Sequence, residues 1–312
     1  MIQLSIGVTS FAAEDPGTWE PLFRAARVAD RAGVDRLVVS DHVVFGERLE
    51  EYGRPEIGGQ EGGKQPTGPD GHWLEPLTTL SVLAGMTSRI RLGTNILVAA
   101  LRRPAVLAKS TATLDVLSGG RLDLGVGVGW QREEYEAAGL DFDGRGRLLD
   151  HTLEVLQTLW REPRAAYDSP ELQFEAIHMM PKPLQAGGVP VWVSGTINPR
   201  VVRRLARFGS GWIPWGPAAA DPVAGVAEMR ERLADAGRDP EGLQVTGALR
   251  VVKTDDGSLD LDRTMEAVPA LAAAGLTDVR AAVRLPEDES AAVEELSGIV
   301  GAFRAAAGRE DA

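Results

Sequence analysis

The 312-residue sequence predicts an α/β fold, a (β/α)8 barrel of the TIM type, and three observations support that prediction. Short runs rich in β-branched residues alternate with longer segments of helical periodicity, which is typical of a parallel sheet. About eight such repeats fit the length of a barrel that carries insertions. No glycine- or proline-rich linker divides the chain, which favours a single domain over residues 1–312. A doubly wound protein of two domains is the competing architecture.

The expected strands and helices alternate along the chain. The predicted strands span residues 2–8, 35–40, 90–98, 121–128, 189–195, 210–216, 243–252 and 277–285. The predicted helices span 18–33, 75–88, 104–117, 131–138 with 145–161, 198–208, 221–236, 262–274 and 287–306. Gly33 and Gly275 follow two of these helices, at the position where a C-terminal capping glycine belongs.

Two segments interrupt the repeat. Residues 46–74 form a long Gly- and Pro-rich connection after the second predicted strand, and a loop of this length is usually functional or disordered. In a barrel this loop lies on the face that carries the active site, and we expect it to close the barrel mouth and exclude water. Residues 164–188 are inserted between the fourth helix and the fifth strand, where we expect a small hairpin.

Composition excludes several classes of function. The net charge of −12 argues against a nucleic-acid surface, and the absence of cysteine excludes thiolate chemistry and disulfides. No apolar run reaches the roughly 18 residues of a membrane span. The beginning, MIQLSIGV, reads as a strand and not as a signal peptide. We therefore expect a cytoplasmic protein with no nucleic-acid or membrane partner.

The stretch VVSDHVVF places Ser40, Asp41 and His42 at the end of the second strand, where a barrel places its chemistry. A histidine exchanges protons near neutral pH, and a neighbouring carboxylate such as Asp41 can orient or charge it. The alternative is a buried histidine that satisfies a backbone carbonyl. Four histidines without H-x-H or H-E-x-x-H spacing predict no metal site. The pair Glu133–Glu134 is typical of a solvated helix face.

Two small-residue loops could bind one phosphate. Gly125, Gly127 and Gly129 alternate in RLDLGVGVGW, but the G-x-G-x-x-G dinucleotide pattern fails at the sixth position. The stretch VWVSGTINPR ends the fifth strand in the same manner. Each loop lies between a strand and a helix, where backbone N–H groups can approach an anion. The alternative is a pair of tight turns that need small residues for packing.

Further polar and aromatic residues lie at predicted strand ends. Thr94 and Asn95 interrupt an otherwise apolar strand, which would bring polar groups to the barrel mouth. Seven tryptophans accompany only three tyrosines, and indoles can form the walls of a pocket for a flat ring. Trp130 is the better pocket candidate, whereas Trp192 lies within a strand and is expected in the core.

Taken together, VSDHVVF, LEPLTTLSVLAGMTSRIRLGT, LSGGRLDLGVGVGW, VPVWVSG and RRLARFGSGWIPW resemble the bacterial luciferase-like monooxygenase superfamily, in the same order and at similar spacing. More narrowly, they resemble its coenzyme F420-dependent oxidoreductase branch. The resemblance implies a (β/α)8 barrel with a flavin or deazaflavin ring in its mouth. Relatives that oxidise glucose 6-phosphate carry an acidic residue where this chain has Trp130, so that activity is not expected.

The resemblance also implies roles for individual residues. Asp41 and His42 would be the catalytic residues beside the ring, with His42 as the proton donor or acceptor. The peptide bond between Asn95 and Ile96 would match a non-proline cis bond that bulges against the ring. The phosphate and tail of the cofactor would bind to Gly127, Val128 and Gly129 and to Ser194, Gly195 and Thr196. The predicted cofactor-binding set is completed by Gly7, Ser40, Thr94 and Trp130.

These implications lead to one expected function and two alternatives. Reduced F420 would exchange hydride with an activated C=C, C=N or C=O bond of a small organic substrate, while His42 supplies or accepts the proton. An FMNH2-dependent monooxygenase using O2 and a partner reductase is the first alternative. A flavin-binding protein without turnover is the second. The resemblance favours a homodimer.

Overall fold

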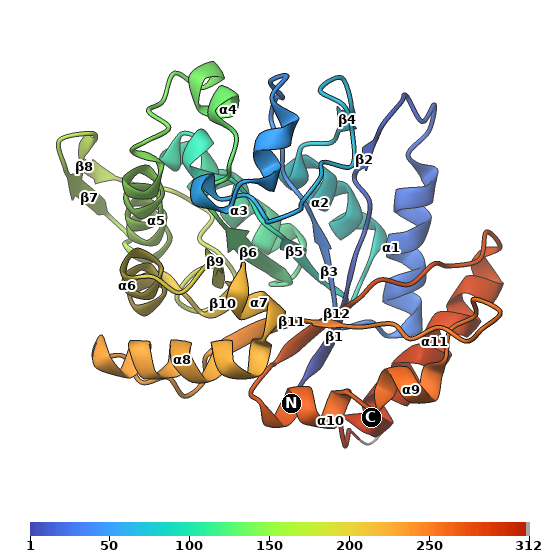
Figure 1. Ribbon diagram of the computed structural model, residues 1–312. Coiled ribbons are helices and arrows are strands. Elements are labelled where there is room, and N and C mark those ends of the chain that lie inside the picture. Colours follow the sequence, from blue (N-terminus) through green and yellow to red (C-terminus); the bar gives the residue numbers. More distant parts are fainter. Residues whose placement is uncertain (310–312) are drawn as a thin grey trace.

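The computed structural model describes residues 1–309, in which eight parallel strands form a closed barrel with helices around it (Figure 1). The predicted (β/α)8 class is therefore confirmed. The strands follow one another around the barrel in the order β1 (Gln3–Gly7), β12 (Asp278–Ala281), β11 (Gln244–Leu249), β10 (Gly211–Pro214), β9 (Val191–Gly195), β6 (Leu122–Val126), β5 (Arg91–Thr94) and β3 (Arg36–Val39).

The helices cover the outside of the barrel. They are α1 (Glu20–Ala32), α2 (Pro76–Met86), α3 (Pro104–Leu117), α4 (Arg132–Ala137), α5 (Arg145–Arg161), α6 (Pro199–Phe208), α7 (Pro217–Ala220), α8 (Pro222–Asp235), α9 (Leu261–Met265), α10 (Val268–Ala273) and α11 (Glu289–Ala306). The helix expected over 262–274 is divided into α9 and α10. Pro269 explains the division, because it lacks the N–H that a continuous helix would bond to the carbonyl of Met265.

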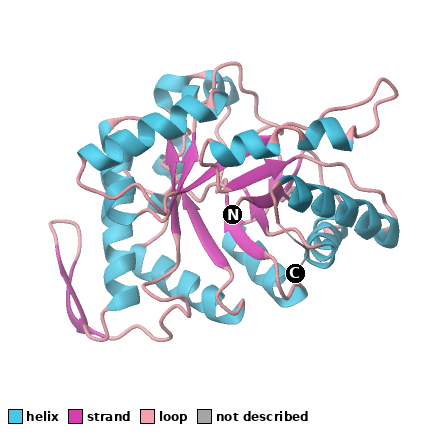
Figure 2. Cartoon of the chain, turned by 90° about the horizontal axis from the view of Figure 1, so that it is seen from below, coloured by secondary structure: helices cyan, strands magenta, loops and turns pink. Residues whose placement is uncertain are grey.

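Both insertions are ordered into small elements. Residues 46–74 contain the 3₁₀ helices η1 (Leu49–Gly53) and η2 (Pro55–Ile57) and the strand β4 (His72–Trp73), which pairs with β2 (Phe11–Ala12). Residues 164–188 contain the predicted hairpin, formed by β7 (Ala165–Asp168) and β8 (Gln173–Ile177), and it projects from the barrel in Figure 2. The first insertion and α4 lie together at the top of Figure 1.

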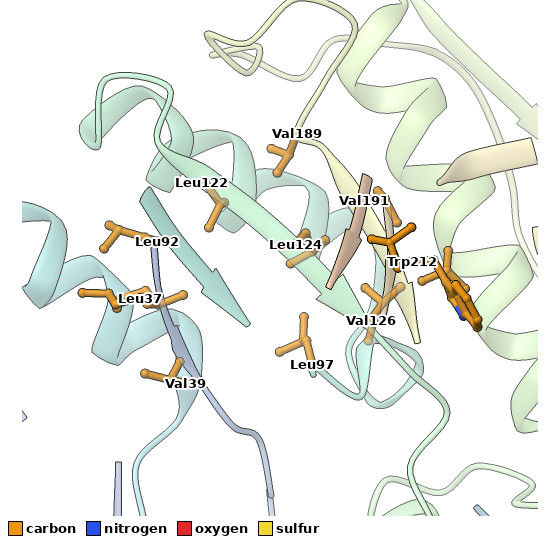
Figure 3. Packing of buried hydrophobic residues seen from close by; sticks show 14 of the residues in the cluster. Leu37, Val39, Leu92, Leu97, Leu122, Leu124, Val126, Val189, Val191 and Trp212 are labelled. Atoms are coloured by element: carbon orange, nitrogen blue, oxygen red, sulfur yellow. The ribbon is translucent and has the colours of Figure 1, made fainter. Parts of the chain in front are cut away.

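Alternate strand residues face the hydrophobic layer beneath the helices. Figure 3 shows part of this layer, in which Leu37, Leu92, Leu124 and Val126 from neighbouring strands are fully buried. None of the helices formed by residues 1–309 combines the length and the apolar character that crossing a bilayer requires.

The inside of the barrel is polar near the N-terminal ends of the strands. Arg36 donates to Asp123 over 2.9 Å and also pairs with Asp278, and Ser5 donates to Asp278 over 2.6 Å. The guanidinium of Arg36 lies 4.5 Å from the ring centroid of Trp192, which is buried as expected. Buried charges are tolerated when they are paired in this way. This network occupies the N-terminal part of the barrel interior, and the candidate site lies at the C-terminal end.

Candidate active site

His42 lies at the C-terminal end of the barrel and contacts a carboxylate from α4. Its Nδ1 is 3.3 Å from Oε1 of Glu134, and the same oxygen accepts a 2.8 Å hydrogen bond from the amide of Val43. Glu134 is only 1% exposed, so the expectation of a solvated face is wrong for this residue. Glu133 does reach the rim, where it forms an ion pair with Arg48.

The contact with Glu134 defines which nitrogen of His42 faces a reaction partner. A carboxylate oxygen accepts hydrogen bonds, so Nδ1 is the donor and Nε2 is left to exchange a proton. Aromatic rings surround the imidazole, with centroids at 4.4 Å for Phe45, 4.8 Å for Trp73 and 6.0 Å for Trp130. These rings keep water away from a group that is suited to general acid–base catalysis.

Asp41 belongs to a different network from its neighbour. Its two carboxylate oxygens accept hydrogen bonds of 2.6 and 2.9 Å from Arg102, and the amide of Val98 donates another of 2.8 Å. Arg102 also pairs with Glu75, which caps α2. Burial lowers the pKa of Arg102, but its hydrogen bonds to Asp41 and Glu75 outweigh burial and raise it. The expectation that Asp41 orients His42 is therefore wrong, and Glu134 makes that contact.

The end of β5 approaches β6 very closely. Thr94 donates from its hydroxyl to the carbonyl of Gly125 over 2.7 Å, and the Asn95–Ile96 peptide bond is cis, as the resemblance implied. A Cβ on Gly125 would lie 2.0 Å from the carbonyl oxygen of Thr94, and one on Gly127 would lie 2.9 Å from Ile96 Cδ1. Gly125 is therefore required, because it lies against backbone, whereas a side chain at position 127 would displace the end of Ile96. Asn95 Oδ1 is buried without a hydrogen-bond partner.

The two predicted phosphate loops are neighbours because their strands pair. Val126 of β6 lies opposite Val193 of β9, so residues 127–129 and 194–196 leave the barrel side by side. The amide of Gly127 is already bonded to the carbonyl of Leu97. Within residues 1–309, the amides of the next two residues of the loop bond to no backbone carbonyl. The backbone amides of Val128 and Gly129 are therefore the groups of this loop that could donate hydrogen bonds to an anion.

Gly7 and Ser40 lie at the same end of two adjacent strands. Gly7 ends β1 and pairs with Val38, and Ser40 directly follows β3. A Cβ on Gly7 would lie 3.9 Å from Cδ of Arg280, an ordinary contact distance, so packing alone does not require a glycine there. Both predicted residues thus belong to the rim that also carries His42.

The segment 46–74 covers the glycine loop. Gly58 has a φ of +101°, and a Cβ there would lie 3.1 Å from the carbonyl oxygen of Gly129. From the opposite side of the mouth, the indole N–H of Trp215 donates to the carbonyl of Gly59 over 2.9 Å. The expectation that this loop closes the barrel mouth is consistent with both contacts.

Sequence reasoning missed Glu134 and Arg102. The signal for Glu134 was its neighbour Tyr135, because an aromatic residue within an acidic run indicates that one face of the helix is buried. The hydroxyl of Tyr135 donates to the carbonyl of Val128 over 2.7 Å. Arg102 lies just before Pro104, the first residue of α3, and nothing in the sequence pairs it with Asp41. In the part of the chain that the structure describes, no group of three or more potential ligands could hold a metal ion.

A parallel barrel with a buried acid–base pair at its C-terminal mouth is typical of TIM-barrel enzymes. Residues 4–296 match the family model of the luciferase-like monooxygenases, so the chain belongs to that family, a family of oxidoreductases.

Individual relatives agree with this assignment. The chain is 31% identical over 278 residues to an uncharacterized protein of Mycobacterium tuberculosis, covering 88% of this chain and 91% of the relative. An F420-dependent secondary alcohol dehydrogenase, solved with an F420–acetone adduct, matches with a TM-score of 0.71 at 15% identity over 97% of this chain and 99% of that chain. The oxygenating constituent of 3,6-diketocamphane monooxygenase from Pseudomonas putida, in complex with FMN, matches with a TM-score of 0.68 at 15% identity over 95% and 96%. At these identities the two structures support the fold alone.

Proposed function

We propose that this chain is an F420-dependent oxidoreductase that exchanges hydride with an activated C=C, C=N or C=O bond of a small organic substrate. The observation that carries the proposal is the His42–Glu134 contact at the mouth of the barrel. Reduction of such a bond requires a proton as well as a hydride, and His42 offers one nitrogen for that proton. Structural neighbours of this fold include both an F420-dependent dehydrogenase and an FMN monooxygenase, so the cofactor titrations below decide between them.

Two features of the mouth fit a flavin-type cofactor. Asn95 Oδ1 is a buried acceptor without a partner, beside the cis bond, and the amides of Val128 and Gly129 are available to an anion. A bound deazaflavin would supply or accept the hydride. The ring would be held by Gly7, Ser40, Thr94, Asn95, Ile96 and Trp130, and the phosphate by Val128, Gly129, Ser194, Gly195 and Thr196.

The residues of the chain would perform the remaining tasks. Glu134 holds Nδ1 of His42, so Nε2 donates the proton when the substrate is reduced and accepts it in the reverse direction. Phe45 and Trp73 exclude water from the imidazole, which prevents the proton from being lost to solvent. Asp41 anchors the segment that follows β3 through its ion pair with Arg102. It has no direct part in proton transfer.

Cofactor affinity tests the proposal directly. We expect F420 to bind at least about tenfold more tightly than FMN, a difference of about 1.4 kcal/mol, in parallel titrations followed by tryptophan fluorescence. Each cofactor is tested oxidised and reduced, and Trp130 near His42 provides an indole at the site. A preference for reduced FMN, with O2 consumption coupled to substrate loss, would instead establish the monooxygenase and its need for a reductase. Tight binding without any substrate-dependent redox change would indicate a protein without turnover.

We propose that two copies of this chain form a homodimer through the face made by α2 and α3. The helix α2 carries no charged residue, and Val82, Val106 and Leu117 are 45%, 64% and 72% exposed on the two adjoining helices. The exposed Lys109 of α3 is a charge on this side of the pair, and its ammonium group donates to the carbonyl of Met180. Exposed apolar side chains gathered on one face mark a protein interface, and a second copy of the same face matches it.

Charge placed on this face should separate the dimer. We expect Val106→Glu combined with Leu117→Glu to sediment as a monomer at micromolar concentration, because buried unpaired carboxylates are costly. Val223→Glu on α8 is the control, since Val223 is 56% exposed on another face. A monomeric wild type, or a double variant that remains dimeric, would contradict the proposal.

A further inference from the structure

Three arginines gather at the helix N-termini that surround the glycine loop. Arg145 begins α5 and Arg132 begins α4. Arg200 is the second residue of α6, four positions after Thr196. Phe142 joins two of them, because its ring centroid is 3.9 Å from the guanidinium carbon of Arg145 and 4.5 Å from that of Arg132. The chain as a whole has a net charge of −12, and Asp143 is the acidic residue paired within this cluster.

Arg145 is at the centre of the cluster and adjoins the covered glycine loop. It donates to the carbonyl of Ile57 over 3.1 Å, and the next residue, Gly58, lies against the carbonyl of Gly129. Its second terminal nitrogen donates to the carbonyl of Phe142 over 3.0 Å, and its Nε is buried without a partner. Arg145 therefore links segment 46–74 to the start of α5, and it does so beside the glycine loop of residues 127–129.

The charges of the cluster are incompletely neutralised. Burial lowers the pKa of Arg145, and Arg132 and Arg200 act in the same direction, whereas Tyr135 and Asp143 oppose them. Asp143 also pairs with Arg132, over 3.1 Å. Arg200 is exposed, and no side-chain partner holds it within residues 1–309. A bound anion would relieve this repulsion, and the free guanidinium fork of Arg200 suits a carboxylate.

We propose that Arg132, Arg145 and Arg200 form a binding site for carboxylate groups that follow the phosphate of the cofactor, and so select F420 over FMN. This inference rests on the proposed function. F420 continues beyond its phosphodiester into a tail of carboxylates, whereas FMN ends at its phosphate. The phosphate would meet Val128 and Gly129, and the tail would continue past Thr196 to the exposed Arg200.

The test compares Arg200 with Arg203, an exposed arginine one turn further along the same helix. Variants R200Q, R200E, R203Q and R203E are titrated with F420, with its phosphate-free and tail-free deazaflavin chromophore, and with FMN. We expect R200Q to weaken F420 binding about threefold and R200E about tenfold, with the larger losses at low ionic strength. Binding of the other two ligands, and all binding by the Arg203 variants, should be unchanged.

Each outcome has a separate meaning. Selective loss of F420 affinity in the Arg200 variants supports the carboxylate site. Equal losses for FMN and F420 overturn it, because they place the cluster at the phosphate. No loss, or the same loss in the Arg203 variants, also overturns it while leaving the proposed function intact. A wild type that binds neither deazaflavin overturns the proposed function and this inference together, and the wild-type titrations alone reveal that case.

Discussion

His42→Ala should lower kcat by about 10²- to 10⁴-fold, because it removes the group that exchanges the substrate proton. Cofactor affinity should change little, since His42 is not among the residues proposed to hold the ring or the phosphate. Turnover is measured with the activated carbonyl or alkene that the wild type reduces, and affinity by fluorescence titration. His72→Ala is the matched control, because His72 is exposed on β4 near the same mouth. Normal turnover by His42→Ala with cofactor bound would refute the assigned role.

Glu134→Gln extends the same prediction to the partner of His42. Glutamine retains an oxygen that can accept from Val43 but loses the charge that supports the imidazole, so we expect kcat to fall about tenfold. Glu133→Gln changes the adjacent residue, which pairs with Arg48 at the surface, and should leave kcat unchanged. Equal effects of the two substitutions would show that the local charge of α4 matters and that the contact with His42 does not.

Asp41→Ala should lower the free energy of unfolding by about 3 to 5 kcal/mol, because it leaves the buried guanidinium of Arg102 without its main partner. The Asp41 side chain is fully buried and accepts three hydrogen bonds. Urea unfolding measures the loss. Asp143→Asn is the control, since its ion pair with Arg132 is exposed and should contribute less than about 1 kcal/mol.

The Asp41 variant also distinguishes two roles for this residue. A stable Asp41→Ala protein whose turnover falls as far as that of His42→Ala would support a direct role in proton transfer. A destabilised protein that retains turnover while folded would support the role seen in the structure, in which Asp41 anchors the loop to α2 and the chain before α3 through Arg102.

The fold was predictable because its signals are local and periodic. Each barrel strand is a short apolar run, and the inserted hairpin and closing loop interrupt the repeat where they were expected. Boundaries were less certain. The strand expected over 90–98 ends at Thr94, and beyond it Leu97 rejoins β6 through a single bridge to Val126. Pro269 divided a helix that apolar periodicity alone would have continued.

The site was predictable in position but not in its partners. A strand end on the active face indicated His42, but sequence adjacency wrongly assigned Asp41 to it. Neighbouring residues in extended chain point to opposite sides, so adjacency argues against contact there. The actual partner, Glu134, is 92 positions away, on a helix face that the sequence predicted to be exposed to solvent. Contacts of this range depend on the closure of the barrel, which no local pattern reports.

Segment 46–74 connects two properties that an enzyme would otherwise adjust independently. It rests on Gly129 through Gly58, is held by Trp215 across the mouth, and begins beside the rim that carries His42. On the proposed function, this segment lies over the residues that would bind the phosphate and also borders the mouth in which the substrate would react. We therefore expect a sequence change here that admits a new substrate to alter the dissociation rate of the cofactor as well.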